Sequence, residues 1–248
     1  MKRFAFIIPI IYLACIPESQ IKKHKTPVQK SIYHYKLARN YVDAHNISMA
    51  LQELRHSLDL NPNNAKAHHL RGFILLGRDD VNGAIEEFKK TLKIDPKYYP
   101  ARNNLGSAYI ATARYRDAIR TLKPLLTEEM YPTPYLAEGN VGWAWFKLGN
   151  LEKAKKHLHR AVFLNPKFCL GFDELGIVLF KQGRINDAKM SLKQAIKKCP
   201  KFPEPYLYMG LLMEKQGDFK KAHENYEKCA ALGRDSTIGR RCNARLDK

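Results

Sequence analysis

Two consecutive stretches of 34 residues in this chain follow one pattern. Residues 135–168 read YLAEGNVGWAWFKLGNLEKAKKHLHRAVFLNPKF, and residues 169–202 read CLGFDELGIVLFKQGRINDAKMSLKQAIKKCPKF. Both stretches have Gly at the eighth position, Ala at the twentieth and Pro at the thirty-second. Because proline keeps the residue before it from continuing a helix, each stretch predicts a pair of antiparallel helices that ends near its proline.

The same pattern extends over most of the chain. Gaps of 34, 70 and 34 residues separate Pro62, Pro96, Pro166 and Pro200, and 70 is two periods plus two residues. Alignment on these prolines gives six units, at residues 31–64, 65–98, 99–134, 135–168, 169–202 and 203–236. The eighth position is small in every unit: Ala38, Gly72, Gly106, Gly142, Gly176 and Gly210. The twentieth is always alanine and the twenty-fourth is large, which predicts a knob and a hole that stack neighbouring units.

These residues resemble those of the tetratricopeptide repeat family, whose units are 34 residues long. The resemblance implies an all-α fold, a right-handed superhelical solenoid of six helix pairs. We expect residues 237–248 to add a capping helix that covers the last exposed face. The third unit lacks the closing proline and has two extra residues, so we expect residues 130–134 to form a longer connection at which the solenoid bends.

The first 14 residues do not follow the repeat. A charged start, Met1 to Arg3, precedes an apolar run from Phe4 to Ala14 that is broken only by Pro9. The run has the length of an export signal and is too short to cross a bilayer as a helix. Residues 1–14 are therefore predicted to be a signal peptide.

The cysteine that follows this run resembles the modified residue of bacterial lipoproteins. Residues 13–15 read LAC, as in a lipobox, although Tyr12 replaces the usual leucine. The resemblance implies cleavage before Cys15 and lipidation of Cys15, and Ile16 favours the outer membrane in that family. Residues 15–30 are then expected to be a tether. Ordinary cleavage and an uncleaved anchor are the alternatives.

Four more cysteines follow, and an even set in an oxidising compartment persists as disulfides. They are Cys169, Cys199, Cys229 and Cys242. Four cysteines allow three pairings. The repeat register favours Cys169 with Cys199, at neighbouring ends of antiparallel helices, and Cys229 with Cys242, which would pin the capping helix. Free thiols buried as small apolar residues are the alternative.

Neither the charge nor the histidines indicate a nucleic-acid partner, a catalytic site or a metal site. The chain has 43 Lys and Arg against 24 Asp and Glu, a formal charge of +19. These basic residues are spread over all repeats, so we expect a solvated basic surface and no nucleic-acid partner. The alternative is that some of these charges rest against anionic lipid headgroups beside the lipid anchor. The groupings His68-His69, His157 with His159, and His223-Glu224 lack metal-ligand spacing. We expect no catalytic, cofactor or metal site and no small-molecule substrate.

In proteins of the resembled family, the first helix of each unit lines a partner-binding groove through its second, fifth, ninth and twelfth positions. The apolar candidates here are Phe73, Leu76, Ile110, Trp143, Phe146, Ile177, Phe180, Leu207 and Leu211. Exposed apolar surface of this extent is typical of a binding site, and Trp143 is the strongest single candidate. The alternative is that the solenoid closes on itself or that a segment such as the tether fills the groove. Chaperone-tail clamps of this family use Lys and Asn at the fifth, ninth and thirteenth positions. The fifth positions here are Tyr35, His69, Asn103, Gly139, Asp173 and Leu207, so no carboxylate clamp is expected.

Three short segments resemble a narrower group. Residues 139–145 (GNVGWAW), the pair Phe168-Cys169 with Gly171, and residues 239–242 (GRRC) are similar to the pilotin-type lipoproteins of type IV pilus systems, notably the Tgl group. The resemblance implies a lipoprotein of the outer membrane, facing the periplasm, that binds a secretin subunit and assists secretin assembly or stability. The competing expectation is a generic periplasmic adaptor for a cell-envelope or secretion complex.

Overall fold

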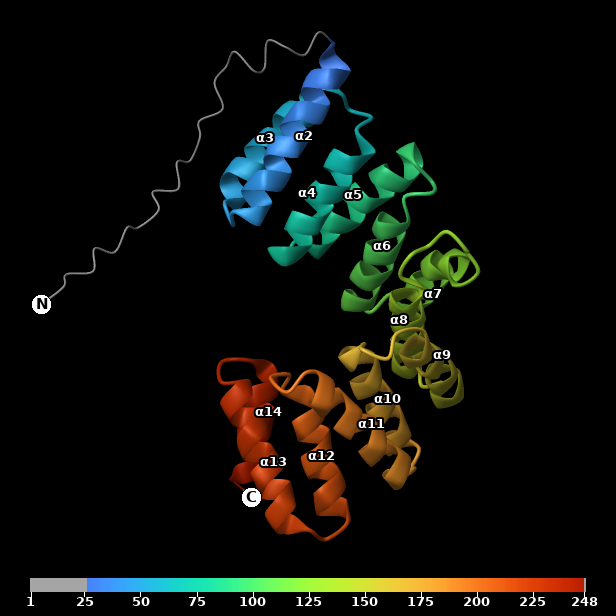
Figure 1. The fold of residues 1–248 in the computed structure, drawn as a ribbon, viewed down its shortest axis with the longest axis vertical. Coiled ribbons are helices and arrows are strands. Elements are labelled where there is room, and N and C mark those ends of the chain that lie inside the picture. The colour runs from blue at the N-terminus through green and yellow to red at the C-terminus, as the bar shows by residue number, and fades with distance from the viewer. Residues whose placement is uncertain (1–25, 248) are drawn as a thin grey trace, which may run out of the picture. The chain divides into compact units, whose positions relative to one another are not determined.

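The computed structural model describes residues 26–247, and all regular structure within that range is helical (Figure 1). The all-α repeat fold is confirmed, because the helices follow one another as six hairpin pairs and a final helix. The predicted signal peptide, Cys15 and most of the predicted tether lie outside the described residues. The pairs are α2 (Pro27–Asp43) with α3 (Ile47–Leu60), α4 (Ala65–Gly77) with α5 (Val81–Ile94), α6 (Tyr99–Ala111) with α7 (Tyr115–Leu122), α8 (Pro134–Lys147) with α9 (Leu151–Leu164), α10 (Cys169–Lys181) with α11 (Ile185–Lys198), and α12 (Glu204–Lys215) with α13 (Phe219–Leu232).

The first helix begins earlier than expected. α2 starts at Pro27, so residues 27–30 are helical and do not belong to the predicted tether. The Thr26 side chain accepts a hydrogen bond from the backbone of Gln29, and the Gln29 side chain accepts one from the backbone of Thr26. This capping box satisfies donors that a helix start leaves free, and proline is well tolerated at the first helical position.

The chain divides into two compact units between Arg71 and Gly72. In the first unit, α2 packs against α3 around a buried polar network. Ser31 and Ser57 lie 3.1 Å apart through their hydroxyl oxygens, and the Asn64 amide donates to both. Because each of these buried groups has partners, the network costs little stability and fixes the pairing of the two helices.

Within the second unit, the large residue at the twenty-fourth position packs against the glycine at the eighth position of the same repeat. A Cβ added to Gly142 would lie 2.7 Å from Leu158, and one added to Gly176 would lie 2.7 Å from Leu192. The large residue at the twenty-fourth position thus fills the space above the glycine of its own helix pair, and the small eighth position lets the two helices approach closely, as the sequence predicted. The fit explains why the eighth position has no room for a larger side chain.

The turn between the two helices of each repeat has a left-handed backbone. All six residues at the fifteenth position have positive φ: His45, Asp79, Ala113, Gly149, Gly183 and Gly217. Glycine adopts this conformation without a steric penalty, and it often ends helices in this way. The sequence indicated the glycines and Asp79, while His45 and Ala113 adopt the same geometry without a residue type that predicts it.

The third repeat is irregular where the sequence indicated a longer connection. α7 has 8 residues, whereas the second helices of the neighbouring repeats have 14, and a short 3-10 helix, η1 (Lys123–Leu126), follows it. Pro124 has no backbone N–H to donate within a continuing α-helix, which accounts for the change of helix type. Leu125 and Tyr131 are buried and pack with Leu122, so the connection is held against the core.

The chain ends with α14 (Thr237–Leu246), which packs on α13 and α12. Ser236 caps its first turn by accepting a hydrogen bond from Gly239. Gly239 approaches the backbone of Gly233 so closely that a Cβ there would clash with it. Within the described residues, no helix is long and apolar enough to span a membrane.

Candidate protein-binding face

The first helices of the later repeats form a continuous layer in the second unit. α6 contacts α8, α8 contacts α10, α10 contacts α12, and α12 contacts α14. Each of the helices α6, α8, α10 and α12 also packs against the second helix of its own pair. One side of each helix is therefore covered, and the positions turned away from its partner helix remain as a candidate face.

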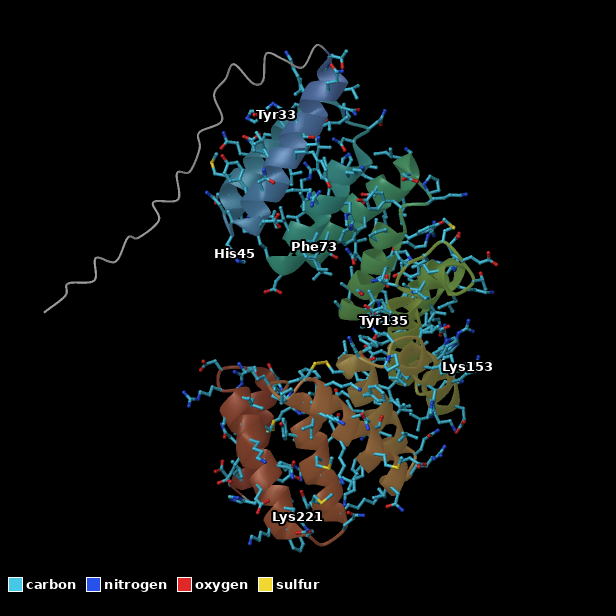
Figure 2. The ribbon with its side chains drawn as sticks, in the orientation of Figure 1. Tyr33, His45, Phe73, Tyr135, Lys153 and Lys221 are labelled. Atoms are coloured by element: carbon cyan, nitrogen blue, oxygen red, sulfur yellow. A yellow bond between two sulfur atoms is a disulfide. The ribbon has the colours of Figure 1, made fainter. Side chains whose placement is uncertain are left out.

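The structure gives the predicted groove residues different surroundings. Phe73, labelled on α4 in Figure 2, is 52% exposed. The half-buried members are Leu76, Ile110, Trp143, Phe146, Phe180 and Leu211. Ile177 and Leu207 are only 1% and 2% exposed, so they belong to the core and offer no contact surface. For these two residues the sequence prediction was wrong, because side chains of the adjoining helices cover them.

Trp143 and Phe146 form the first aromatic pair of this face. Their rings are stacked on α8 with centroids 4.8 Å apart and an interplanar angle of 25°. The Lys147 Nζ lies 4.9 Å from the Trp143 ring centroid and 6.0 Å from that of Phe146. A cation over an aromatic face is attracted by the ring quadrupole, so this lysine steadies the pair.

A second aromatic pair joins two helices. Phe180 of α10 meets Tyr208 of α12 edge to face, with centroids 6.3 Å apart. The Lys215 Nζ lies 5.8 Å from the Phe180 ring centroid. We call Trp143, Phe146, Phe180 and Tyr208 the aromatic face. Tyr208 and the two lysines were missed in the sequence, although both lysines occupy the thirteenth position of their units and could have been found there.

Three carboxyl groups accompany the aromatic residues on α10 and α12. Asp173 and Glu174 are 1% and 8% exposed, and Glu204, the first residue of α12, is half-buried. Burial raises the pKa of Asp173 and of Glu174 well above the ordinary carboxyl range, and the negative charge of Glu204 raises both further. Burial also raises the pKa of Glu204, while the positive charges of Arg241 and Lys147 oppose that rise.

The histidines act as structural partners. His157 Nδ1 lies 2.7 Å from the Glu138 carboxylate, and His68 Nε2 lies 2.9 Å from the carbonyl oxygen of Pro62. Burial lowers the pKa of His69 to about 4, which keeps that ring neutral at physiological pH. Between residues 26 and 247, no three His, Cys, Asp or Glu side chains are grouped so as to hold a metal ion.

The four cysteines of the repeats form two disulfides in the pairing that the register favours. Cys169 is bonded to Cys199 and Cys229 to Cys242, each with a Cα–Cα distance of 6.0 Å. The first bond joins the start of α10 to the end of α11, and the second joins α13 to the capping helix. Both bonds lie in the part of the chain that holds Phe180 and the three carboxyls.

Comparison with known families identifies the repeats. A family model described as tetratricopeptide repeat matches residues 35–99 and 103–167, just over half of the chain. The chain belongs to the tetratricopeptide repeat (TPR) family. Two further TPR models match residues 75–130 and 176–217. The aromatic face therefore lies on first helices of TPR units, in a family whose members generally bind proteins and are not enzymes.

The TPR chain is also similar to proteins of type IV pilus biogenesis. It is 22% identical over 163 residues to the type IV pilus assembly protein PilF of Pseudomonas aeruginosa. That match covers 64% of this chain and 65% of PilF, so the chain spans just under two thirds of the relative's length.

Two solved structures have the same fold. A crystal structure of PilW, titled a widely conserved type IV pilus biogenesis factor, has a TM-score of 0.75 and 24% identity, covering 85% of this chain and 96% of PilW. The structure of Pseudomonas aeruginosa PilF has a TM-score of 0.73 and 20% identity, covering 87% of this chain and 97% of PilF. At these identities the likeness establishes the fold alone.

Proposed function

We propose that this chain is a lipid-anchored TPR scaffold in type IV pilus biogenesis, acting as a pilotin that assists assembly or stability of the secretin. The observation that carries the proposal is the sequence similarity to a type IV pilus assembly protein, PilF. The aromatic face supplies the binding surface that a scaffold needs. Large aromatic side chains contribute most to binding energy when a partner buries them.

The proposed mechanism is shielding. A secretin subunit must cross the periplasm before it inserts, and its amphipathic segments carry apolar surface that would otherwise aggregate. Trp143, Phe146 and Phe180 would cover such a segment. The proposed lipid on Cys15 would hold the scaffold at the outer membrane, facing the periplasm, where the subunit is delivered.

The anchor is tested by labelling. Cells that express the chain are fed a labelled fatty acid, and the membrane fraction is compared with that of a Cys15→Ala variant. Label on the native chain, and none on the variant, is expected. A soluble and unlabelled native chain would overturn the outer-membrane location.

The pilus role is tested by deleting the gene and measuring pilus extension and heat-resistant secretin multimers. Loss of both is expected. Unchanged pili and multimers would instead support a generic periplasmic adaptor for another envelope complex.

The face is tested by the double substitution Trp143→Asp with Phe180→Asp, which places charge among the apolar contacts. We expect secretin multimers to fall to the level of the deletion strain. The matched control is Phe163→Asp on α9, because Phe163 is 81% exposed and lies outside the aromatic face. Normal multimer levels with a folded double variant would refute the role of the face.

A further inference from the structure

The three carboxyls beside the aromatic face are not explained by stacking of the repeats. Asp173 occupies the fifth position of its unit and Glu174 the sixth. At the fifth position the other units have Tyr35, His69, Asn103, Gly139 and Leu207. At the sixth they have Lys36, Leu70, Asn104, Asn140 and Tyr208. None of these is acidic, so the repeat fold forms without a carboxyl at either place.

The two buried carboxyls have no partner in the described part of the chain. Asp173 Oδ1 and Glu174 Oε2 are enclosed and accept no hydrogen bond. Neither side chain takes part in the ion pairs of residues 26–247. Buried polar atoms are nearly always satisfied in folded proteins, so two unsatisfied oxygens on adjacent residues indicate a missing donor.

Glu138 is the comparison within the same chain. This glutamate is as deeply buried as Asp173, yet His157 lies 2.7 Å from one of its oxygens and Arg160 lies 3.0 Å from the other. The protein thus supplies cations to one buried carboxylate and supplies none to Asp173 and Glu174. With 43 Lys and Arg in the chain, a shortage of internal cations is not the reason.

We propose that Asp173, Glu174 and Glu204 form a site for the guanidinium group of one arginine in the bound partner segment. A guanidinium has five N–H donors in a planar fork and can serve several carboxylate oxygens at once. The proposal rests on the proposed function only in taking the aromatic face as the surface that the partner covers.

The surroundings favour a single side chain of this shape. Glu204, at the start of α12, is the most exposed of the three carboxyls. Tyr208 follows Glu204 by one helical turn and contacts Phe180, so the apolar stem of an arginine has aromatic rings to lie against. The net charge of +19 repels a polybasic tract, which favours one arginine within an otherwise neutral or acidic segment.

The raised pKa values of Asp173 and Glu174 agree with an empty cation site, whereas the positive charges of Arg241 and Lys147 act on Glu204. Without a cation, burial and mutual repulsion favour the protonated forms of Asp173 and Glu174. A guanidinium between them would favour the charged forms and lower both pKa values. This change gives a signal that belongs to the site and to no other part of the chain.

The test is a titration of the isotope-labelled chain with N-acetyl-L-arginine amide, followed by nuclear magnetic resonance. We expect millimolar probe to shift the backbone signals around Asp173, Glu174 and Glu204 and to lower the pKa values of the first two, measured from their carboxyl carbons. N-acetyl-L-citrulline amide has the same shape without the charge and should give no shift. N-acetyl-L-lysine amide should bind several-fold more weakly.

The variants test the assignment of residues. Asp173→Asn with Glu174→Gln should weaken arginine binding at least tenfold, and the exposed-acid control Glu227→Gln should leave it unchanged. Equal shifts from citrulline, equal affinity for lysine, or unchanged binding by the double variant would each overturn the proposal. Because the assay uses neither pili nor secretin, its failure leaves the proposed function standing, and a failed pilus assay leaves the arginine site standing.

Discussion

A left-handed residue ends the first helix of every repeat, and the cost of that conformation depends on the side chain. Glycine adopts positive φ freely, whereas a residue with a Cβ is strained by about 1 kcal/mol or more. Ala113 has a φ of 57° and His45 a φ of 57°. The backbone nevertheless turns at both places, because the helices on either side are fixed by their packing. Asp79 in the second repeat has a φ of 62°, so local strain is stored in each of the first three repeats.

Replacing His45 or Ala113 by glycine should release this strain. We expect His45→Gly and Ala113→Gly each to raise the free energy of unfolding by about 0.5–1 kcal/mol, measured by denaturant titration. The reverse change, Gly149→Ala, should lower it by a similar amount. If Ala113→Gly and Gly149→Ala changed stability in the same direction, backbone strain at the fifteenth position would not be the cause.

At the scale of the helix pair, the contact between the eighth and twenty-fourth positions decides how closely two helices approach. A Cβ on Gly142 would meet the Leu158 side chain at 2.7 Å and the Leu158 backbone nitrogen at 3.1 Å. The side chain could rotate, but the backbone could only move with its helix. An extra methyl group here therefore separates α8 from α9.

Gly142→Ala should lower the free energy of unfolding by about 1–3 kcal/mol, the usual cost of overpacking a well-filled core. Gly77→Ala is the matched control, since a Cβ on Gly77 meets nothing within 4 Å. This control should be neutral or slightly stabilising, because alanine favours a helix more than glycine does. Equal losses from the two substitutions, in thermal or chemical unfolding, would contradict the packing explanation.

The capping helix depends on its disulfide. Cys229 and Cys242 are separated by 13 residues in sequence, and closing a loop of that size stabilises a fold by about 3 kcal/mol. We expect Cys229→Ala with Cys242→Ala to increase hydrogen exchange throughout α14 while α10 and α11 stay protected. Exchange that rose equally in all the later helices would show that the bond stabilises the whole unit and not the cap alone.

The sequence predicted the helix pairs well because one period placed Gly142, Ala154 and Leu158 on the same internal surface. It could not show that Ile177 and Leu207 are covered, since that depends on the neighbouring helix. Asp173 and Glu204 are 31 positions apart, and only the contact of α10 with α12 brings their charges together. Features that repeat within a unit were predictable, whereas features that arise between units were not.

For the molecule as a whole, the buried carboxyls of Asp173 and Glu174 make the free energy of unfolding depend on pH. In the unfolded chain Asp173 and Glu174 have ordinary pKa values of 3.8 and 4.5, and in the folded chain burial raises both pKa values. At a pH above these ordinary values, both carboxyls have lost their protons in the unfolded chain but still hold them in the folded chain. The free energy of unfolding therefore falls as pH rises from about 4 toward the raised pKa values.

Neutral replacements should remove this dependence. Asp173→Asn with Glu174→Gln is expected to raise the melting temperature at pH 7.5 by several degrees, because the amides do not ionise and so remove the loss of stability that the native carboxyls cause as pH rises. Near pH 4 the gain should nearly vanish, because the native carboxyls are then protonated. A gain of the same size at both pH values would mean that charge is not responsible.

The positions of the two disulfides determine which end of the repeat array we expect to unfold first. Disulfides cross-link the last two repeats and the cap, whereas within the described residues the first helix pair is held by non-covalent contacts alone, among them the buried Leu54 and the hydrogen bonds of Ser31, Ser57 and Asn64. Repeat arrays open from their least stable end. A mechanical pull through the proposed anchor at Cys15 would act on that end of the chain first. α2 and α3 would then unfold and lengthen the connection to the membrane, while the aromatic face stayed bound to the proposed partner.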